Sequence, residues 1–178
     1  MRSIPRHVFP FLLAAAAGCA ASTETFHPTE QVVLERSGAS TARYTLSTPE
    51  GDVGRAELWS SGAVRERLVD GDRTVVRVAL EVSNTSAAPL AVEAVEIDPV
   101  TDDAQRLHNV QPMRVTGATT VPPGRKHRIE YDFGLPQGIA PDDVAAFSVH
   151  WRVTAGENVV EQVTPFRAEG ASPWVAAR

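Results

Sequence analysis

The stretch from Thr74 to Ile97, TVVRVALEVSNTSAAPLAVEAVEI, decides the fold. In its first half the apolar residues occupy every second position, which is the period of a strand with one buried face. These residues are Val76, Val78, Leu80 and Val82. The segment from Asn84 to Pro89 is rich in turn-forming residues, and its proline cannot continue a hydrogen-bonded ladder. Because the alternation resumes at Leu90, the stretch predicts a strand, a turn and a second strand.

The second strand contains one irregularity. Leu90 and Val92 share one phase of the alternation, whereas Val95 and Ile97 share the other. One extra residue near Glu93 and Ala94 restores the inward face while strand pairing continues. The sequence therefore predicts a β-bulge at this point.

Two later segments repeat the strand pattern. The inward positions of the first are His127, Ile129, Tyr131 and Phe133, and those of the second are Phe147, Val149, Trp151 and Val153. Turn signals recur every 8 to 12 residues or so, without a helical period beyond the N-terminal segment, as is typical of β-sandwiches. We predict an all-β protein with an antiparallel, immunoglobulin-like β-sandwich of about 8–10 short strands. This domain is expected to span residues 40–167 and to be followed by a tail at 168–178.

Composition limits the classes of function. The chain has 178 residues, of which 43% are hydrophobic, and a formal net charge of −5. This is ordinary globular material and enough for one domain with a core. A nucleic-acid-binding protein normally carries a basic field, so we expect no nucleic-acid partner.

The N-terminal residues have the pattern of an export signal. Arg2 and Arg6 precede a short apolar segment from Val8 to Ala17, followed directly by Gly18 and by Cys19, the one cysteine of the chain. The run Ala16-Ala17-Gly18-Cys19 resembles the bacterial lipobox, with Ala16 where that motif prefers leucine. The alternative is an ordinary signal peptide cut near Ala20 or Ala21, with the loss of Cys19.

The lipobox resemblance implies a lipid anchor. Residues 1–18 are then a lipoprotein signal peptide, and residues 19–39 a lipidated N-terminus and tether. Cys19 is the lipidation site and holds the protein to the membrane. Because Ala20 stands where aspartate favours retention in the inner membrane, the resemblance points to the outer membrane, with the domain facing the periplasm or the surface.

The sandwich region also resembles a known group of domains. Residues 78–92, VALEVSNTSAAPLAV, and the strand entry from Val121 to Phe133 are similar to exported immunoglobulin-like domains of bacterial lipoproteins. They are more distantly similar to the water-stress domains of late-embryogenesis-abundant proteins. The resemblance covers roughly residues 40–167 and implies a fold without assigning a site, because sandwich folds host unrelated functions.

Catalytic motifs are missing from the sequence. It contains neither a Gly-x-Ser-x-Gly elbow nor a His-Glu-x-x-His pair, and it has no glycine-rich phosphate loop. We therefore expect a protein that is not an enzyme and needs no cofactor. The expected role is non-catalytic binding, scaffolding or accessory work in the bacterial envelope, where another envelope protein is a possible partner.

Metal binding is the rival hypothesis. None of the four histidines His27, His108, His127 and His150 lies at a short ligand spacing from another. The strand phases place His127 on the apolar face of its strand and His150 on the face opposite the apolar one. The acidic stretch Asp98 to Asp103, predicted to be a loop, lacks the glycine and glutamate of an EF-hand. The sequence thus predicts no metal site, and the alternative function is a periplasmic metal- or small-solute-binding protein.

Overall fold

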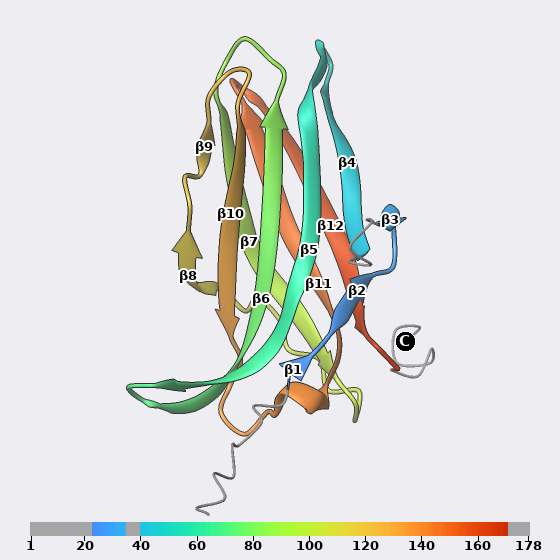
Figure 1. Ribbon diagram of the computed structural model, residues 1–178, viewed down its shortest axis with the longest axis vertical. Helices are drawn as coiled ribbons and strands as arrows, with labels where there is room; N and C mark the ends of the chain where they lie inside the picture. Colours follow the sequence, from blue (N-terminus) through green and yellow to red (C-terminus); the bar gives the residue numbers. More distant parts are fainter. Residues whose placement is uncertain (1–22, 35–39, 171–178) are drawn as a thin grey trace, which may run out of the picture.

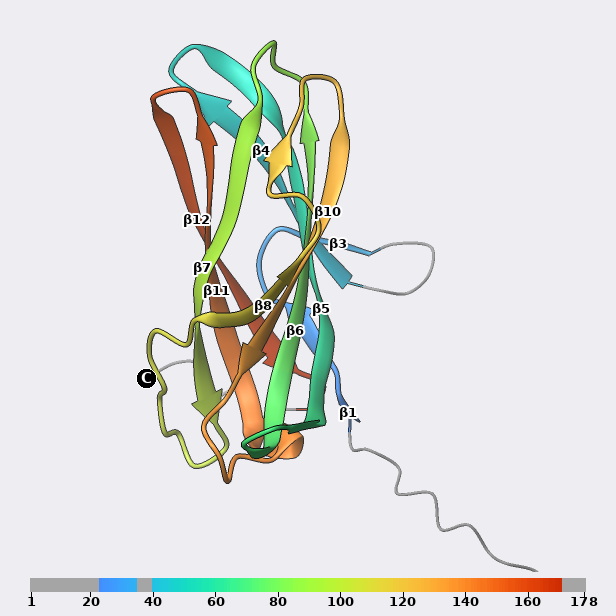
Figure 2. The ribbon, with the colours of Figure 1, turned by 90° about the vertical axis from the view of Figure 1, so that its left-hand side faces the viewer.

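The strands form two antiparallel sheets packed face to face, as Figure 1 shows from the front and Figure 2 from the side. The computed structural model describes residues 23–34 and 40–170. The predicted class, an all-β antiparallel sandwich, is confirmed.

The larger sheet has seven strands, in the order β3-β4-β5-β6-β10-β8, with β1 paired to β5. Its strands are β1 (Thr23–Glu24), β3 (Val32–Leu34), β4 (Ser40–Thr48), β5 (Gly51–Leu68), β6 (Gly71–Asn84), β8 (Pro112–Thr116) and β10 (Lys126–Gly134).

The smaller sheet has five strands, in the order β2-β12-β11-β7-β9. Its strands are β2 (Phe26–Pro28), β7 (Leu90–Thr101), β9 (Thr120–Val121), β11 (Val144–Ala155) and β12 (Asn158–Ala168). The one helical element in residues 23–34 and 40–170 is a 3₁₀ turn, η1 (Pro141–Asp143). This part of the chain contains no helix of the length and hydrophobicity needed to cross a membrane.

The core lies between the two sheets and follows the predicted alternation. The inward apolar side chains of β6 and of its neighbour β10, such as Leu80 and Ile129, are fully buried. They face the inward residues of β11, of which Trp151 is the largest. Ala79 departs from the pattern, because it is buried on the outer face. It pairs with Trp59, whose ring is covered by the Arg128 guanidinium 4.9 Å from the ring centre.

A polar contact ties the two sheets together inside the core. The Trp151 indole N–H donates to Thr164 Oγ1 over 2.9 Å, and the Tyr44 hydroxyl of the opposite sheet lies 2.7 Å from the same oxygen. The Tyr44 and Trp151 rings meet edge to face with their centroids 5.2 Å apart. The polar ends of two large side chains are thus satisfied without water.

The predicted turn between Asn84 and Leu90 carries the chain from one sheet to the other. Strand β6 pairs with β5 and β10, whereas β7 pairs with β11 and β9, so the two strands do not form a hairpin. The buried Asn84 amide fixes this crossover. Its nitrogen donates to the carbonyls of Ala88 (2.7 Å) and Val121 (2.9 Å), and its oxygen accepts from the backbone and the hydroxyl of Ser86.

The predicted β-bulge is present in β7. Opposite it in β11, His150 pairs with Glu96 and the next residue, Trp151, pairs with Ala94, so Val95 is the extra residue. The insertion keeps both Ala94 and Ile97 buried. The phase slip in the sequence therefore located the bulge to within two residues.

The described strands extend beyond both ends of the predicted sandwich domain, residues 40–167. Residues assigned to the tether, 19–39, include strands β1, β2 and β3, and Phe26 of β2 is buried against Phe147. Very short strands give too few residues for a visible period. At the other end, β12 continues to Ala168, one residue into the predicted tail; residues 171–178 lie outside the described residues, as do the signal segment and Cys19.

The acidic stretch from Asp98 to Asp103 is also not a simple loop, because β7 continues to Thr101. Pro99 is buried within the strand, and its carbonyl accepts from the Leu107 N–H over 2.9 Å. Since N–H and C=O of one residue point to the same side of an antiparallel strand, the missing N–H faces this irregular neighbour rather than β11. The proline is therefore tolerated inside the strand.

Replacing Leu80 by alanine tests the core. The side chain is fully buried in the middle of β6, so Leu80→Ala should lower the free energy of unfolding by about 2–5 kcal/mol through the cavity it leaves. Val69→Ala is the control, because Val69 is fully exposed at the tip of the β5–β6 hairpin. Urea denaturation measures both variants, and equal midpoints would contradict this assignment of the core.

Asn84→Ala tests the crossover. The substitution removes the Asn84 donor from the buried Val121 carbonyl and the Asn84 acceptor from the Ser86 N–H, and a buried polar group left without a partner costs about 1–3 kcal/mol. We expect a loss of at least about 2 kcal/mol in the free energy of unfolding. The neighbouring control Thr85→Ala changes an exposed side chain and keeps the backbone bond to Val53, so its stability should match the wild type.

Candidate functional site

The four histidines considered as ligands lie in different surroundings. His27 on β2 is 3.8 Å from the Glu169 carboxylate, and His127 on β10 faces inward with its Nδ1 buried and without a hydrogen bond. His108, in the segment between β7 and β8, and His150, on β11, both approach Asp98. The proposed lipidation site, Cys19, lies outside the described residues.

The candidate site lies on the outer face of the five-stranded sheet. Because Val95 is inserted in β7, Glu96 and Asp98 both project outward, and His150 of β11 stands directly opposite Glu96. His150 Nε2 lies 3.2 Å from Asp98 Oδ2. We call Glu96, Asp98 and His150, all half-buried, the His150 cluster.

The segment that follows β7 folds back against this site. Bridges between Val100 and Arg106 and between Ile97 and Val110 hold it along β7. The Asn109 backbone N–H donates to Asp98 Oδ1 over 2.9 Å, and His108 Nδ1 lies 3.9 Å from the same oxygen. Beside the cluster is a groove of about 340 Å³, whose polar lining includes Asp98, Arg106, His108, Ser148, His150 and Arg167.

Short spacings along the sequence do not reveal this cluster. Glu96 and His150 are far apart in sequence and become neighbours through the pairing of β7 with β11. A signal was present, since Glu96 and Asp98 are two residues apart and therefore share a strand face. Their histidine partner depends on which strand lies alongside, and the alternation pattern does not specify this.

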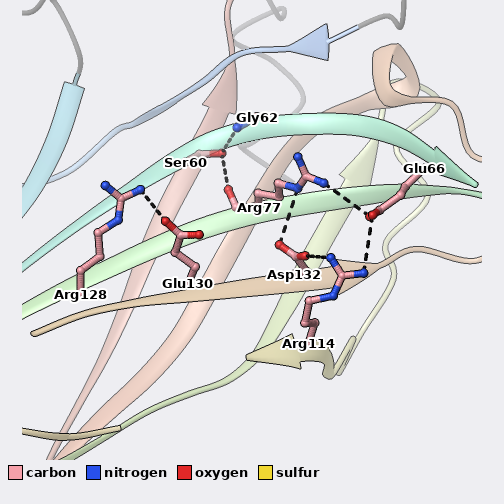
Figure 3. A network of polar contacts seen from close by, with 8 residues as sticks. All are labelled: Ser60, Gly62, Glu66, Arg77, Arg114, Arg128, Glu130 and Asp132. Atoms are coloured by element: carbon pink, nitrogen blue, oxygen red, sulfur yellow. Dashed lines mark hydrogen bonds and ion pairs between the residues drawn. The ribbon is translucent and has the colours of Figure 1, made fainter. Parts of the chain in front are cut away.

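A separate polar network covers the outer face of the seven-stranded sheet (Figure 3). Its ion pairs join Arg77 to Glu66 (3.5 Å) and Asp132 (3.7 Å), and Arg114 to the same two carboxylates (3.5 and 3.0 Å). Ser61 is a bulge residue in β5, where Ser60 Oγ donates to the Arg77 carbonyl and accepts from the Gly62 N–H. With two arginines and two carboxylates the network is balanced in charge, so we assign it a structural role across β5, β6, β10 and β8.

Burial affects the acid in this network. Desolvation raises the pKa of Asp132 above its ordinary value, and the positive charges of Arg77 and Arg114 oppose this shift. Glu66 and Glu130 add smaller contributions that raise the pKa further. The arginines therefore favour the ionised carboxylate in a partly buried position.

A second groove, of about 440 Å³, opens between β7 and β8 and is mostly apolar. Among the described residues, the buried hydroxyl of Tyr131 that contributes to it has no hydrogen-bond partner. Burial raises the pKa of Tyr131 to about 12, and the nearby Ala94 backbone opposes this shift. The groove thus places a buried hydroxyl group beside a mostly apolar lining.

Comparisons with known proteins assign neither a family nor a site. No family model matches the chain, and no curated protein matches it. Among solved structures, the chain is similar to a functionally unknown protein from Listeria monocytogenes EGD-e, with 12% sequence identity and a TM-score of 0.39. The similarity covers 85% of this chain and 89% of that one.

Removing Arg77 tests the electrostatics of the network. In Arg77→Met the pKa of Asp132 should rise further, because one of the two positive charges that lower this pKa, those of Arg77 and Arg114, is lost. The native state then binds this proton more tightly than the unfolded chain does. The variant should consequently lose more stability than the wild type as the pH rises through the Asp132 pKa.

Carbon-13 NMR titration of the Asp132 carboxyl measures the effect. Arg152→Met is the control, since Arg152 pairs with Glu93 on the other sheet and should leave the pKa of Asp132 unchanged. A pKa of Asp132 that does not move in Arg77→Met would show that Arg77 contributes nothing to the charge balance.

Proposed function

We propose that this protein is a membrane-anchored, non-catalytic binding module of the bacterial envelope, attached by lipid on Cys19. The observation that carries the proposal is the run Ala16-Ala17-Gly18-Cys19, directly after an apolar segment, in a chain with a single cysteine. One acyl chain of myristoyl length binds a membrane only marginally. Lipoprotein-type modification supplies several chains on one residue, which is enough for stable attachment.

The arrangement of the sandwich agrees with attachment from one end. Thr23 begins β1, and even a fully extended chain from Cys19 to Thr23 spans at most about 14 Å. Strand β1 lies at the same end of the sandwich as η1 (Figure 1). Under this proposal, that end faces the membrane and the long strands extend away from it.

Acidic side chains surround Glu24 of β1. Burial raises the pKa of Glu24, and the negative charges of Asp142, Asp102 and Glu169 raise it further. Such a surface does not attract anionic lipid, because binding of that kind needs clustered lysine or arginine. Under this proposal attachment depends on the lipid at Cys19, and the sheets are left available to another envelope protein.

A second candidate function is binding of a metal ion or a small solute in the periplasm. The specific observation in its favour is the His150 cluster beside its groove. This candidate is compatible with the anchor, because the cluster lies on β7 and β11 and the anchor precedes β1.

Cys19→Ala tests the anchor. Wild-type protein should fractionate with membranes and partition into detergent, because lipoprotein-type modification places several acyl chains on Cys19. The variant should either remain as an uncleaved precursor or appear as a folded soluble domain. Ser22→Ala is the control that keeps Cys19 and should fractionate as the wild type does.

Mass spectrometry of the mature N-terminus completes this experiment. Acylated Cys19 as the first residue is the expected result. Wild-type protein that is soluble in the periplasm, with a mature N-terminus beyond residue 19, would overturn the lipid-anchor proposal.

A further inference from the structure

We propose that Glu96, Asp98 and His150 bind one divalent transition-metal ion, with Zn²⁺ as the reference ion, on the outer face of the five-stranded sheet. This inference rests on the second candidate function and names the ligand class of that site. It is independent of the anchor at Cys19.

The spacing of the ligand atoms suits a single ion. One atom from each residue of the His150 cluster lies within 4.8 Å of the other two. Two ligands about 2.0–2.2 Å from a tetrahedral zinc ion are about 3.3–3.6 Å apart, close to the 3.2 Å between His150 Nε2 and Asp98 Oδ2. Glu96 stands directly opposite His150, and one of its carboxylate oxygens lies within the same 4.8 Å.

The charge of the cluster also favours a cation. Among the described residues, neither Glu96 nor Asp98 forms an ion pair with arginine or lysine, and the partners of Asp98 are the two histidines and a backbone N–H. Several other carboxylates on the outer faces have such pairs. These are Glu57 with Arg43, Glu66 and Asp132 with Arg77 and Arg114, Glu81 with Lys126, and Glu93 with Arg152.

The carboxylates are held in place by neutral donors. The Asn109 N–H donates to Asp98, and Gln111 Nε2 donates to Glu96 Oε2 over 3.2 Å. The Asn109 side-chain amide is satisfied when its NH₂ group faces Glu96, 3.0 Å from Oε1. Hydrogen bonds of this kind orient metal ligands without neutralising their charge.

The ligand types indicate the class of metal. An imidazole nitrogen with two carboxylates suits zinc and its neighbours in the first transition row. Calcium takes 6–8 oxygen ligands, and magnesium prefers water and oxygen, so His150 disfavours both ions. Three protein ligands leave at least one coordination position for water.

Calorimetric titration with Zn²⁺ tests the site. Every protein sample is the tag-free full chain in detergent and carries Cys19→Ala, so that no thiol binds zinc. We expect saturable binding of one ion per chain. Glu96→Gln and His150→Ala should each weaken this binding at least about tenfold. Removing a residue that only hydrogen-bonds to a metal ligand already lowers metal affinity by about 10- to 100-fold.

The controls separate the site from general surface binding. Glu93→Gln removes a carboxylate from the same strand, and His27→Ala removes an exposed histidine outside the cluster; both should bind Zn²⁺ as the parent does. Ca²⁺ at the same concentration should give no saturable heat. Equal melting temperatures without zinc establish that the variants are folded. If His150→Ala is unstable, Glu96→Gln still tests the site, because glutamine has nearly the same shape as glutamate.

Two outcomes would overturn the metal site: no saturable binding of Zn²⁺, or unchanged affinity in both Glu96→Gln and His150→Ala. Neither result bears on the anchor, which membrane fractionation of Cys19→Ala measures separately. Failure of this inference is therefore distinguishable from failure of the proposed function.

Discussion

The arrangement of both sheets depends on the buried amide of Asn84. An antiparallel sandwich needs a point at which the chain leaves one sheet and enters the other, and here this point separates β6 from β7. The backbone at the crossover cannot use a strand ladder, so its polar groups need other partners. Asn84 supplies them through two donated and two accepted hydrogen bonds, and its own backbone bonds to Arg125 and Gly124. The same side chain thus closes the turn and joins it to the segment that precedes β10.

The two outer faces use charge differently. On the seven-stranded sheet, Arg77 and Arg114 offset the cost of half-burying Glu66 and Asp132, and the network spans strands distant in sequence. On the five-stranded sheet, Glu96 and Asp98 meet histidines and neutral donors. A balanced network of the first kind stabilises pairing, whereas a negative cluster of the second kind is suited to bind a cation.

Much of the fold was predictable because alternation records burial directly. The inward apolar residues of β6, β10 and β11 followed from the phase of the alternation, as did a bulge near Glu93 and Ala94, which the structure has at Val95. The crossover was not predictable, since Asn84 to Pro89 signals a turn without specifying which strand lies beside the next one. The proline of the acidic stretch suggested a loop, but Pro99 fits the strand because its missing N–H faces an irregular neighbour. The His150 cluster required knowledge of pairing between distant strands. It was therefore beyond any reading of local spacing.

The single inserted residue at Val95 also restricts how this chain can change during evolution. Upstream of it, Ala94 faces the core, and downstream Glu96 and Asp98 face outward while Ile97 faces inward. Deleting one codon here would reverse the faces of every later residue of β7, placing two carboxylates inside the sandwich and Ile97 outside. Substitution at Val95 changes one half-buried side chain, whereas deletion turns the inward side chains of the second half of β7 outward and the outward ones inward. Length variation should therefore be excluded from this position in descendants that keep the fold, even where its residue type varies.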